Sequence, residues 1–349
     1  MRLAFTPYRL IFRFPAGTSR GVLHEKLTYF VKVWDELCPE KIGYGEAAVF
    51  EGLSRETAQD VERDLEACRS YDDWHLQDLS HLSSSAFFGI EQALRDLENG
   101  GNGIYWPSRF TEGKSEIIIN GLVWMGDFDL MLKRLLKKIE QGFQCIKIKI
   151  GAVKWEEEME LIRQIRLRCG NSVTIRVDAN GGLSYPDCMS KLNELASLDV
   201  HSIEQPIPAG NWDEMRRICL DSPVPVALDE ELIGMRKEYR EEMLSYIKPQ
   251  FIILKPSLCF GFTGSSEWIQ LADSHGIGWW ITSALESTVG LSAIAQFTGN
   301  LNIQIPQGLG TGNLFENNFP SPLLLEGDKL AFTGDPKAFR PSLENLNWR

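Results

Sequence analysis

The chain has 349 residues, 43% of them hydrophobic and 24% charged, which is the balance of a globular protein able to bury a sizeable core. Its formal net charge of −12 argues against nucleic acid or an anionic membrane as a partner, because both need a basic face, and favours a small molecule. The seven cysteines are scattered and include no Cys-x-x-Cys, so neither a disulfide framework nor a zinc site is indicated.

The same features bear on where the protein works. No apolar run approaches the ~20 residues that span a bilayer. The segment Met1–Tyr8 lacks the apolar region of a signal peptide. Unpaired cysteines suit a reducing compartment, so we expect a cytoplasmic protein.

Residues 1 to about 48 alternate between apolar and polar side chains and predict three antiparallel strands. Between the first two strands lies the small-residue loop Pro15–Gly21, which contains Thr18, Ser19 and Arg20. Its composition favours a mobile flap, while an ordinary hairpin turn is an equally good interpretation.

Helical patterns follow at residues 54–68 and 83–97, and the second ends in a glycine-rich segment. The stretch after Thr311 is rich in Pro, Asn and Gly, and we expect it to fold back on this first unit. The sequence therefore predicts an α+β capping domain at residues 1–113, completed by about 313–349.

From Glu116 the pattern changes to short apolar strands that alternate with helical intervals, without antiparallel hairpins. Eight strands are predicted, at residues 117–120, 146–150, 173–177, 202–203, 224–228, 251–254, 278–281 and 302–305. Such alternation gives a parallel sheet, and eight strands close it. We therefore predict a TIM-type (β/α)7β barrel at residues 114–312 behind the N-terminal α+β capping domain.

Five charged residues follow these strands at nearly even intervals, and they are Lys149, Asp178, Glu204, Asp229 and Lys255. Their residue numbers differ by 29, 26, 25 and 26, about the length of one βα repeat. A regular step brings all five to one rim of a barrel.

Lys147 and Lys149 fall on one face of the predicted strand Cys145–Gly151, while its isoleucines fall on the other. In a barrel strand the lysines would point into the mouth, and their repulsion would lower the pKa of at least one of them, which could then act as a base. The alternative is an exposed edge strand whose lysines are simply solvated.

Asp178, Glu204 and Asp229 each stand at the carboxyl end of a strand, where barrel active sites lie. One acid in such a place is usually a helix cap or a loop residue, but three on successive strands would repel strongly without a cation between them. Only oxygen ligands are offered, so Mg²⁺ or Mn²⁺ is favoured over Zn²⁺.

Lys255 ends the sixth strand, across the barrel mouth from Lys149, although a lysine there could also merely extend to solvent. After the seventh strand come Ser283, Glu286 and Ser287. They could contact polar groups of a substrate or cap the helix that follows, and the two interpretations are equal.

The motifs that carry a family resemblance are the Lys-x-Lys strand, Asp178-Ala179-Asn180, Glu204-Gln205-Pro206, Leu228-Asp229-Glu230 and Leu254-Lys255-Pro256-Ser257. In this order they resemble the muconate-lactonizing-enzyme-like subgroup of the enolase superfamily, and within it the o-succinylbenzoate synthases of menaquinone biosynthesis. Sites of this superfamily pair a Lys or His base with Mg²⁺. The likeness covers nearly the whole chain.

The resemblance implies that Asp178, Glu204 and Asp229 bind Mg²⁺, which neutralises a substrate carboxylate and stabilises the enediolate formed when its α-proton leaves. It implies that Lys149 is the base and then returns the proton to the departing hydroxyl. The implied reaction is the syn dehydration of 2-succinyl-6-hydroxy-2,4-cyclohexadiene-1-carboxylate to o-succinylbenzoate.

The resemblance also implies supporting roles. Lys255 would stabilise the intermediate electrostatically, and Lys147 would assist Lys149. The residues expected around the metal ligands are Arg176, Asn180 and Glu230. The loop near Thr18 to Gly21, with Phe50–Leu53, resembles the capping-domain loops that close over substrate.

Three other functions remain to be weighed. A racemase or epimerase of N-acylamino acids or dipeptides would suit two lysines equally well, but dipeptide epimerases carry an Asp-x-Asp pair where this chain has Pro306–Thr311. Muconate cycloisomerisation is less favoured, because no acid stands at the eighth strand. The third alternative is a catalytically inactive barrel that serves as a binding module. The presence of three acids and two lysines together argues against it, because binding alone does not require them.

Overall fold

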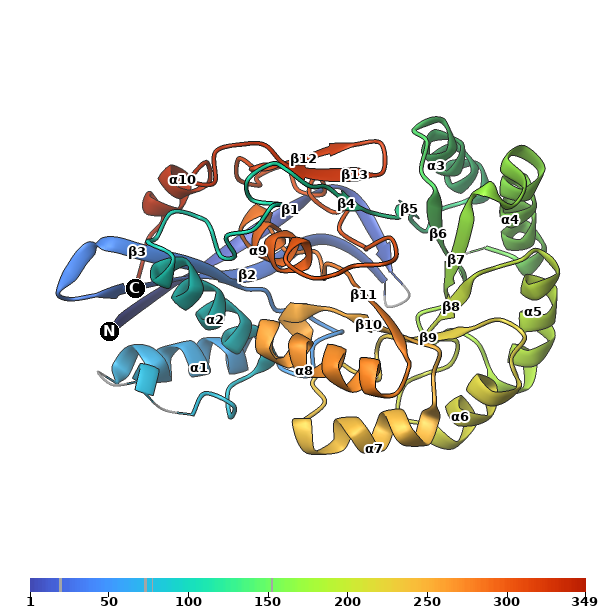
Figure 1. Cartoon of the computed structure of the whole chain (residues 1–349), viewed down its shortest axis with the longest axis horizontal. Helices are drawn as coiled ribbons and strands as arrows, with labels where there is room; N and C mark the ends of the chain where they lie inside the picture. The colour runs from blue at the N-terminus through green and yellow to red at the C-terminus, as the bar shows by residue number, and fades with distance from the viewer. Residues whose placement is uncertain (19–20, 72–73, 77, 152) are drawn as a thin grey trace.

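The computed structural model describes residues 1–18, 21–71, 74–76, 78–151 and 153–349. In Figure 1 the antiparallel sheet from the start of the chain lies beside the red C-terminal segment, and the parallel sheet with its outer helices lies to the right. No helix in the described part of the chain is long and apolar enough to cross a membrane.

The first 47 residues form the three predicted antiparallel strands, which pair in chain order. They are β1 (Arg2–Thr18), β2 (Gly21–Asp35) and β3 (Cys38–Ala47). The backbones of β1 and β2 pair as far as Thr18 and Gly21, so for the described part of the segment the hairpin interpretation is favoured over the mobile flap.

Two helices cover this sheet, α1 (Ala58–Ser70) and α2 (Ser84–Glu98). Helix α2 lies directly on the backbone of β3. A Cβ atom on Gly45 would lie 2.0 Å from the carbonyl oxygen of Gly89, and a Cβ atom on Gly89 would lie 2.7 Å from the backbone nitrogen of Ala47. Because both residues are glycines, the backbones of α2 and β3 approach more closely than any side chain at these positions would permit.

The second half of the fold is a curled parallel sheet in the order β5 to β11. Its strands are β5 (Gly121–Val123), β6 (Cys145–Lys149), β7 (Thr174–Asp178), β8 (Ser202–Glu204), β9 (Val226–Leu228), β10 (Phe251–Leu254) and β11 (Gly278–Ile281). Most of their apolar residues are buried, as expected for strands covered by helices on the outer face.

Seven helices follow these strands in turn, and Figure 1 shows most of them around the outside of the sheet. They are α3 (Phe128–Glu140), α4 (Trp155–Cys169), α5 (Tyr185–Ser197), α6 (Trp212–Asp221), α7 (Lys237–Ile247), α8 (Gly261–Ser274) and α9 (Thr288–Gly299). Three short 3₁₀ helices are η1 (Trp74–Leu76), η2 (Gly170–Ser172) and η3 (Pro256–Leu258). The predicted fold class, a barrel-type parallel sheet behind an N-terminal antiparallel unit, is confirmed.

The first and eighth barrel strands were placed wrongly from the sequence. Residues 117–118 form β4 in a separate sheet with β12 (Leu323–Glu326) and β13 (Lys329–Phe332), so the first barrel strand is β5. No strand forms at 302–305. Instead Gln307 and Gly308 close the sheet by single bridges to Ile119 and Thr282. Pro306, just before them, has no N–H group with which to extend a ladder.

The end of the chain lies against its beginning. The backbone nitrogen of Phe5 donates to the carbonyl oxygen of Arg349 at 3.0 Å, and Phe12 forms a bridge with Phe315. The last helix is α10 (Arg340–Glu344), drawn in red beside the first sheet in Figure 1. The C-terminal residues therefore pack on the sheet formed by the first 47.

We expect Gly45→Ala to lower the free energy of unfolding by about 3 kcal/mol, because the new methyl group would push α2 away from β3. Urea denaturation measures this loss. Gly312→Ala is the matched control, since its Cβ would make an ordinary contact at 3.4 Å with Leu291. Equal stability of the two variants would contradict the close packing described here.

Candidate active site

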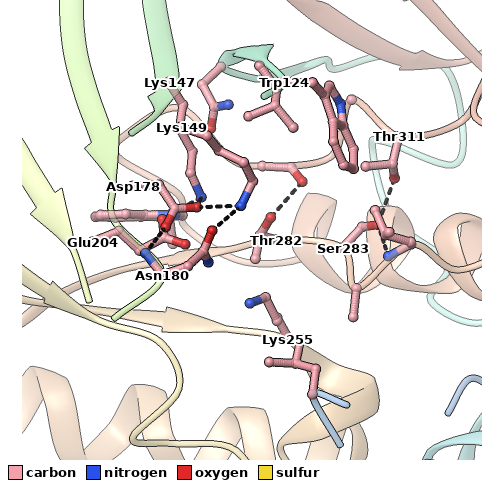
Figure 2. A pocket seen from close by; sticks show the side chains of 18 of the residues that line it. Trp124, Lys147, Lys149, Asp178, Asn180, Glu204, Lys255, Thr282, Ser283 and Thr311 are labelled. Atoms are coloured by element: carbon pink, nitrogen blue, oxygen red, sulfur yellow. Dashed lines mark hydrogen bonds and ion pairs between the residues drawn. The ribbon is translucent and has the colours of Figure 1, made fainter. Parts of the chain in front are cut away.

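A pocket opens at the carboxyl ends of the parallel strands, and Figure 2 shows its charged wall. That wall carries Lys147, Lys149, Asp178, Asn180 and Glu204, and Lys255 lines the opposite side (Figure 2). The apolar wall of the pocket is formed by Phe50, Leu53, Leu122, Trp124, Ala284 and Leu285. A site of this kind suits a small molecule with one charged and one apolar part.

The register of the strands brings the charged residues together. Lys149 on β6 is the partner of Asp178 on β7, and Asp178 is the partner of Glu204 on β8. On β6 the isoleucines 146 and 148 are fully buried, so the period of two turns Lys147 and Lys149 to the opposite side. The predicted placement of both lysines in the mouth is therefore what the structure shows.

Each acid of the predicted metal site accepts a hydrogen bond from a lysine. Lys147 Nζ lies 2.9 Å from Asp178 Oδ2 and 2.5 Å from Glu204 Oε2. Lys149 Nζ lies 3.0 Å from the same Asp178 oxygen, and Lys255 Nζ contacts Asp229 Oδ2. In Figure 2 Lys255 stands on the opposite side of the pocket from Lys149.

The electrostatics of this cluster differ from one sequence expectation. Burial would lower the pKa of Lys147, but the Asp178 and Glu204 carboxylates outweigh it, and the pKa is raised. Burial would also lower the pKa of Lys255, but the Asp229, Glu230 and Glu204 carboxylates together outweigh it, and the pKa is raised. The prediction that repulsion between neighbouring lysines depresses a pKa does not hold for Lys147, because carboxylates lie closer to it.

The pKa values of the buried carboxyl groups shift in opposite directions. Burial would raise the pKa of Asp178, but Lys147 and Lys149 hold that pKa well below its usual range. Burial, then the charge of Asp178, raises the pKa of Glu204 to about 8. Burial, then the charge of Asp229, raises the pKa of Glu230 to about 7. Several buried acids therefore compete for few positive charges.

The fit of these acids to a divalent cation rests on their oxygen atoms. Asp229 Oδ1 is buried and has no hydrogen-bond partner within the described ranges, as suits an oxygen ligand of a hard cation. As they stand, no three His, Cys, Asp or Glu side chains in the described part of the chain are grouped to hold a metal ion. The donor chemistry fits Mg²⁺, and the assignment of the three ligands stays a prediction.

Of the residues expected around the metal ligands, Asn180 and Glu230 contact the charged cluster and Arg176 does not. Asn180 accepts from Lys149 Nζ at 2.5 Å and donates to Glu230 Oε1 at 3.3 Å, so both residues belong to the cluster. Arg176 instead donates to the carbonyl oxygen of Pro306 at 2.9 Å, and its guanidinium lies 4.0 Å from the ring centroid of Trp280. Arg176 thus lies over an aromatic ring rather than in contact with the three acids.

The residues after β11 separate into two groups. Ser283 lines the pocket and shares a 2.6 Å hydrogen bond with Thr311. Glu286 is buried and accepts from Ser257, and Ser287 is the N-cap of α9. For Glu286 and Ser287 the structure therefore favours a structural role over substrate contact.

The loop residues predicted to contact substrate are Thr18, Ser19 and Arg20. Ser19 and Arg20 lie outside the described residues, and for Thr18 only the backbone is described. Sequence reasoning missed Asn120, Trp124 and Thr311, which all line the pocket. The first two flank the short β5 strand, which was placed a few residues too early.

Comparisons with known proteins give the family context. Residues 131–331 match the enolase C-terminal domain-like family. An o-succinylbenzoate synthase from Desulfotalea psychrophila is 40% identical to this chain over 95% of it and 98% of the relative. The crystal structure of MenC from Desulfotalea psychrophila LSv54 has a TM-score of 0.80 and 36% identity, over 95% of this chain and 99% of that one.

More distant structures share the fold. The N-succinyl Arg/Lys racemase from Bacillus cereus has a TM-score of 0.82 at 21% identity, over 99% of this chain and 97% of its own. The L-Ala-D/L-Glu epimerase from Bacillus subtilis has a TM-score of 0.80 at 18% identity, over 96% and 97%. At such identities the likeness extends to the fold alone.

We expect Asp229→Asn to weaken Mg²⁺ binding by about tenfold or more, because it removes one negative charge from the three acids. Isothermal titration of the purified protein with MgCl₂ measures the change. Asp221→Asn, at the exposed end of α6, is the matched control and should leave the affinity unchanged. Unchanged affinity in Asp229→Asn would remove that residue from the metal site.

Proposed function

We propose that this chain, which belongs to the enolase superfamily and within it to the o-succinylbenzoate synthases, dehydrates 2-succinyl-6-hydroxy-2,4-cyclohexadiene-1-carboxylate to o-succinylbenzoate. The observation that carries the proposal is the pair of lysines, Lys149 and Lys255, on opposite sides of a pocket that Asp178 and Glu204 also line (Figure 2). The enzyme is then a hydro-lyase of menaquinone biosynthesis, and we place it in the cytoplasm.

Lys149 is proposed to move the proton. Its neutral amine takes the α-proton of the substrate carboxylate, and the resulting ammonium gives a proton to the departing hydroxyl as the carbon–oxygen bond breaks. Water leaves and the ring becomes aromatic. Asn180 Oδ1, 2.5 Å from Lys149 Nζ, fixes the direction of the amine. One residue that serves both steps acts from one face, which gives a syn elimination.

Lys255 and the acids are proposed to stabilise charge. Lys255 is 9% exposed and faces the pocket opposite Lys149, so its ammonium can stabilise the negative charge that develops on the substrate. Asp178, Glu204 and Asp229 would hold Mg²⁺, or Mn²⁺, and Lys147 would neutralise part of their charge. When bound, this cation supplies positive charge to the substrate carboxylate and so makes the α-proton more acidic.

A racemase or epimerase of the same superfamily is the second candidate, because two lysines facing one carbon could exchange its proton from either side. The segment Pro306–Thr311 offers no pair of acids for the ammonium group of a dipeptide. The pocket residues there are Gly308, Gly310 and Thr311. If the chain is a racemase, an N-acylamino acid, which has no free ammonium group, is therefore a better candidate substrate than a dipeptide.

One assay separates the two candidates. The purified protein with Mg²⁺ is given the cyclohexadiene carboxylate, and ultraviolet absorbance follows formation of the aromatic product. In parallel, N-acylamino acids and dipeptides are incubated in deuterium oxide and examined for α-deuterium exchange. We expect dehydration, and exchange without dehydration would overturn the proposal.

Lys149→Ala is expected to lower kcat by about 10³-fold or more, because the base is lost, while Mg²⁺ affinity stays nearly intact. Steady-state kinetics and metal titration measure the two effects. Lys154→Ala, on the exposed start of α4, serves as the control and should keep full activity. Substantial turnover by Lys149→Ala would exclude it as the base.

Lys255→Met is expected to lower kcat comparably, by about 10²–10³-fold, through loss of charge stabilisation. A substrate with deuterium at the α-carbon distinguishes this variant from Lys149→Ala through the isotope effect on kcat. We expect Lys255→Met to retain a primary isotope effect on kcat, because Lys149 still removes the proton. Wild-type kcat in this variant would refute its role.

Removal of divalent cations with EDTA, followed by gel filtration, is expected to abolish dehydration. Addition of Mg²⁺ should restore the rate, and Mn²⁺ should do so in part. Ca²⁺ at the same concentration is the control for a purely structural effect, since it should restore thermal stability without the full rate. Full activity in the stripped protein would exclude a metal-dependent reaction.

A further inference from the structure

The turn after β11 forms part of the apolar pocket wall and holds a strained residue. Leu285 has a φ of +62°, in the left-handed region that a leucine rarely adopts. Such a conformation persists only where its surroundings hold it firmly. Leu285 also lines the pocket next to Ala284 and Ser283, so whatever holds this turn also shapes the site.

Lys26, on β2 of the N-terminal sheet, provides one of the holding contacts. Its side chain is buried, and Nζ donates to the carbonyl oxygens of Leu285 at 2.8 Å and Ala284 at 3.2 Å. The same Nζ lies 5.8 Å from the ring centroid of Phe50, on another part of the pocket wall. One ammonium group of the N-terminal unit therefore contacts two segments that line the pocket.

Glu46, on β3, holds the other end of the turn. Its carboxylate accepts from the backbone nitrogen of Ser287 at 3.0 Å, from Ser287 Oγ at 2.6 Å and from the backbone nitrogen of Gly290 at 2.9 Å. These are groups at the N-terminus of α9, which favours a negative charge. A Cβ atom on Gly290 would lie 2.8 Å from the carboxylate, so the glycine makes room for it.

In this buried region one ammonium group, that of Lys26, lies near two carboxylates. Burial lowers the pKa of Lys26, and the nearby Glu286 and Glu46 carboxylates oppose that shift. Glu286 itself accepts from the backbone nitrogen of Ala284 at 2.8 Å, inside the same turn. Neither Lys26 nor Glu46 lines the pocket, so both act on it through the turn.

From these contacts we propose that Lys26 and Glu46 are positioning residues that hold the Leu285 turn against the pocket and thereby set the affinity for substrate. The proposal rests on the proposed function for its kinetic test, while its structural consequence can be measured without any substrate. The N-terminal unit then contributes to the site through its buried sheet as well as through its loops.

The test uses Lys26→Met, which keeps the length of the side chain and removes its three donors, with Lys41→Met on the exposed part of β3 as matched control. We expect Lys26→Met to raise KM by about tenfold while kcat changes less than about threefold, because Lys149 and Lys255 keep their places. A general loss of folded protein would instead lower kcat at unchanged KM. That result, or wild-type kinetics, would overturn the proposal.

Hydrogen exchange followed by mass spectrometry provides the second readout. In Lys26→Met we expect amides of the segment 283–287 to exchange about tenfold faster, while those of α4 stay as protected as in the wild type. If the wild-type protein fails to dehydrate the substrate, the proposed function falls, and the exchange result still decides this inference. Unchanged exchange at 283–287 would overturn it.

Glu46→Gln is a second variant that tests the same proposal if Lys26→Met does not fold. The amide keeps one acceptor oxygen but turns a donor toward the N-terminus of α9, which already presents donors. We expect the same rise in KM and the same faster exchange at residues 283–287 as in Lys26→Met. A wild-type KM and wild-type exchange in this variant would count against the proposal as firmly as in the first.

Discussion

The site depends on the pairing of buried carboxylates with lysine ammonium groups at one rim of the sheet. Asp178, Glu204 and Asp229 are 1–3% exposed, and charges so far from water are tolerated only when they are paired. The register of parallel strands sets Lys149 beside Asp178, and it sets Asp178 beside Glu204, so that Lys147 reaches both acids. The same closeness places the Lys149 amine beside Asp178 and Glu204 in the lining of one pocket.

The N-terminal unit completes the site in two ways. Phe50 and Leu53 supply part of the apolar wall. Beneath the pocket, Lys26 and Glu46 reach the turn that contains Leu285. The barrel rim supplies the rest of this wall with Leu122, Trp124, Ala284 and Leu285. Together these apolar side chains can contact an apolar ring, while the lysines and acids of the same pocket can contact its carboxylate.

Fold prediction from the sequence succeeded where a strand was apolar and bounded by helices, as for β6, β7 and β10. It erred at residues 117–120 and 302–305, where the barrel closes. Residues 117–118 pair with β13, near the end of the chain, and that distant partner has no signature in the local pattern. The closing contacts of Gln307 and Gly308 involve too few residues to show a period of two.

The sequence by itself determined the order of the reactive groups, because the even steps from Lys149 to Lys255 reflect a repeat whose strands must end at one rim. It also determined the chemistry of those groups, since oxygen ligands and amines are fixed by residue type. Only the tertiary structure decided that Arg176 lies over Trp280, that Glu286 and Ser287 support a turn, and that Lys26 holds Leu285. These contacts join residues far apart in the chain, and their energies arise from burial and geometry that no local pattern records.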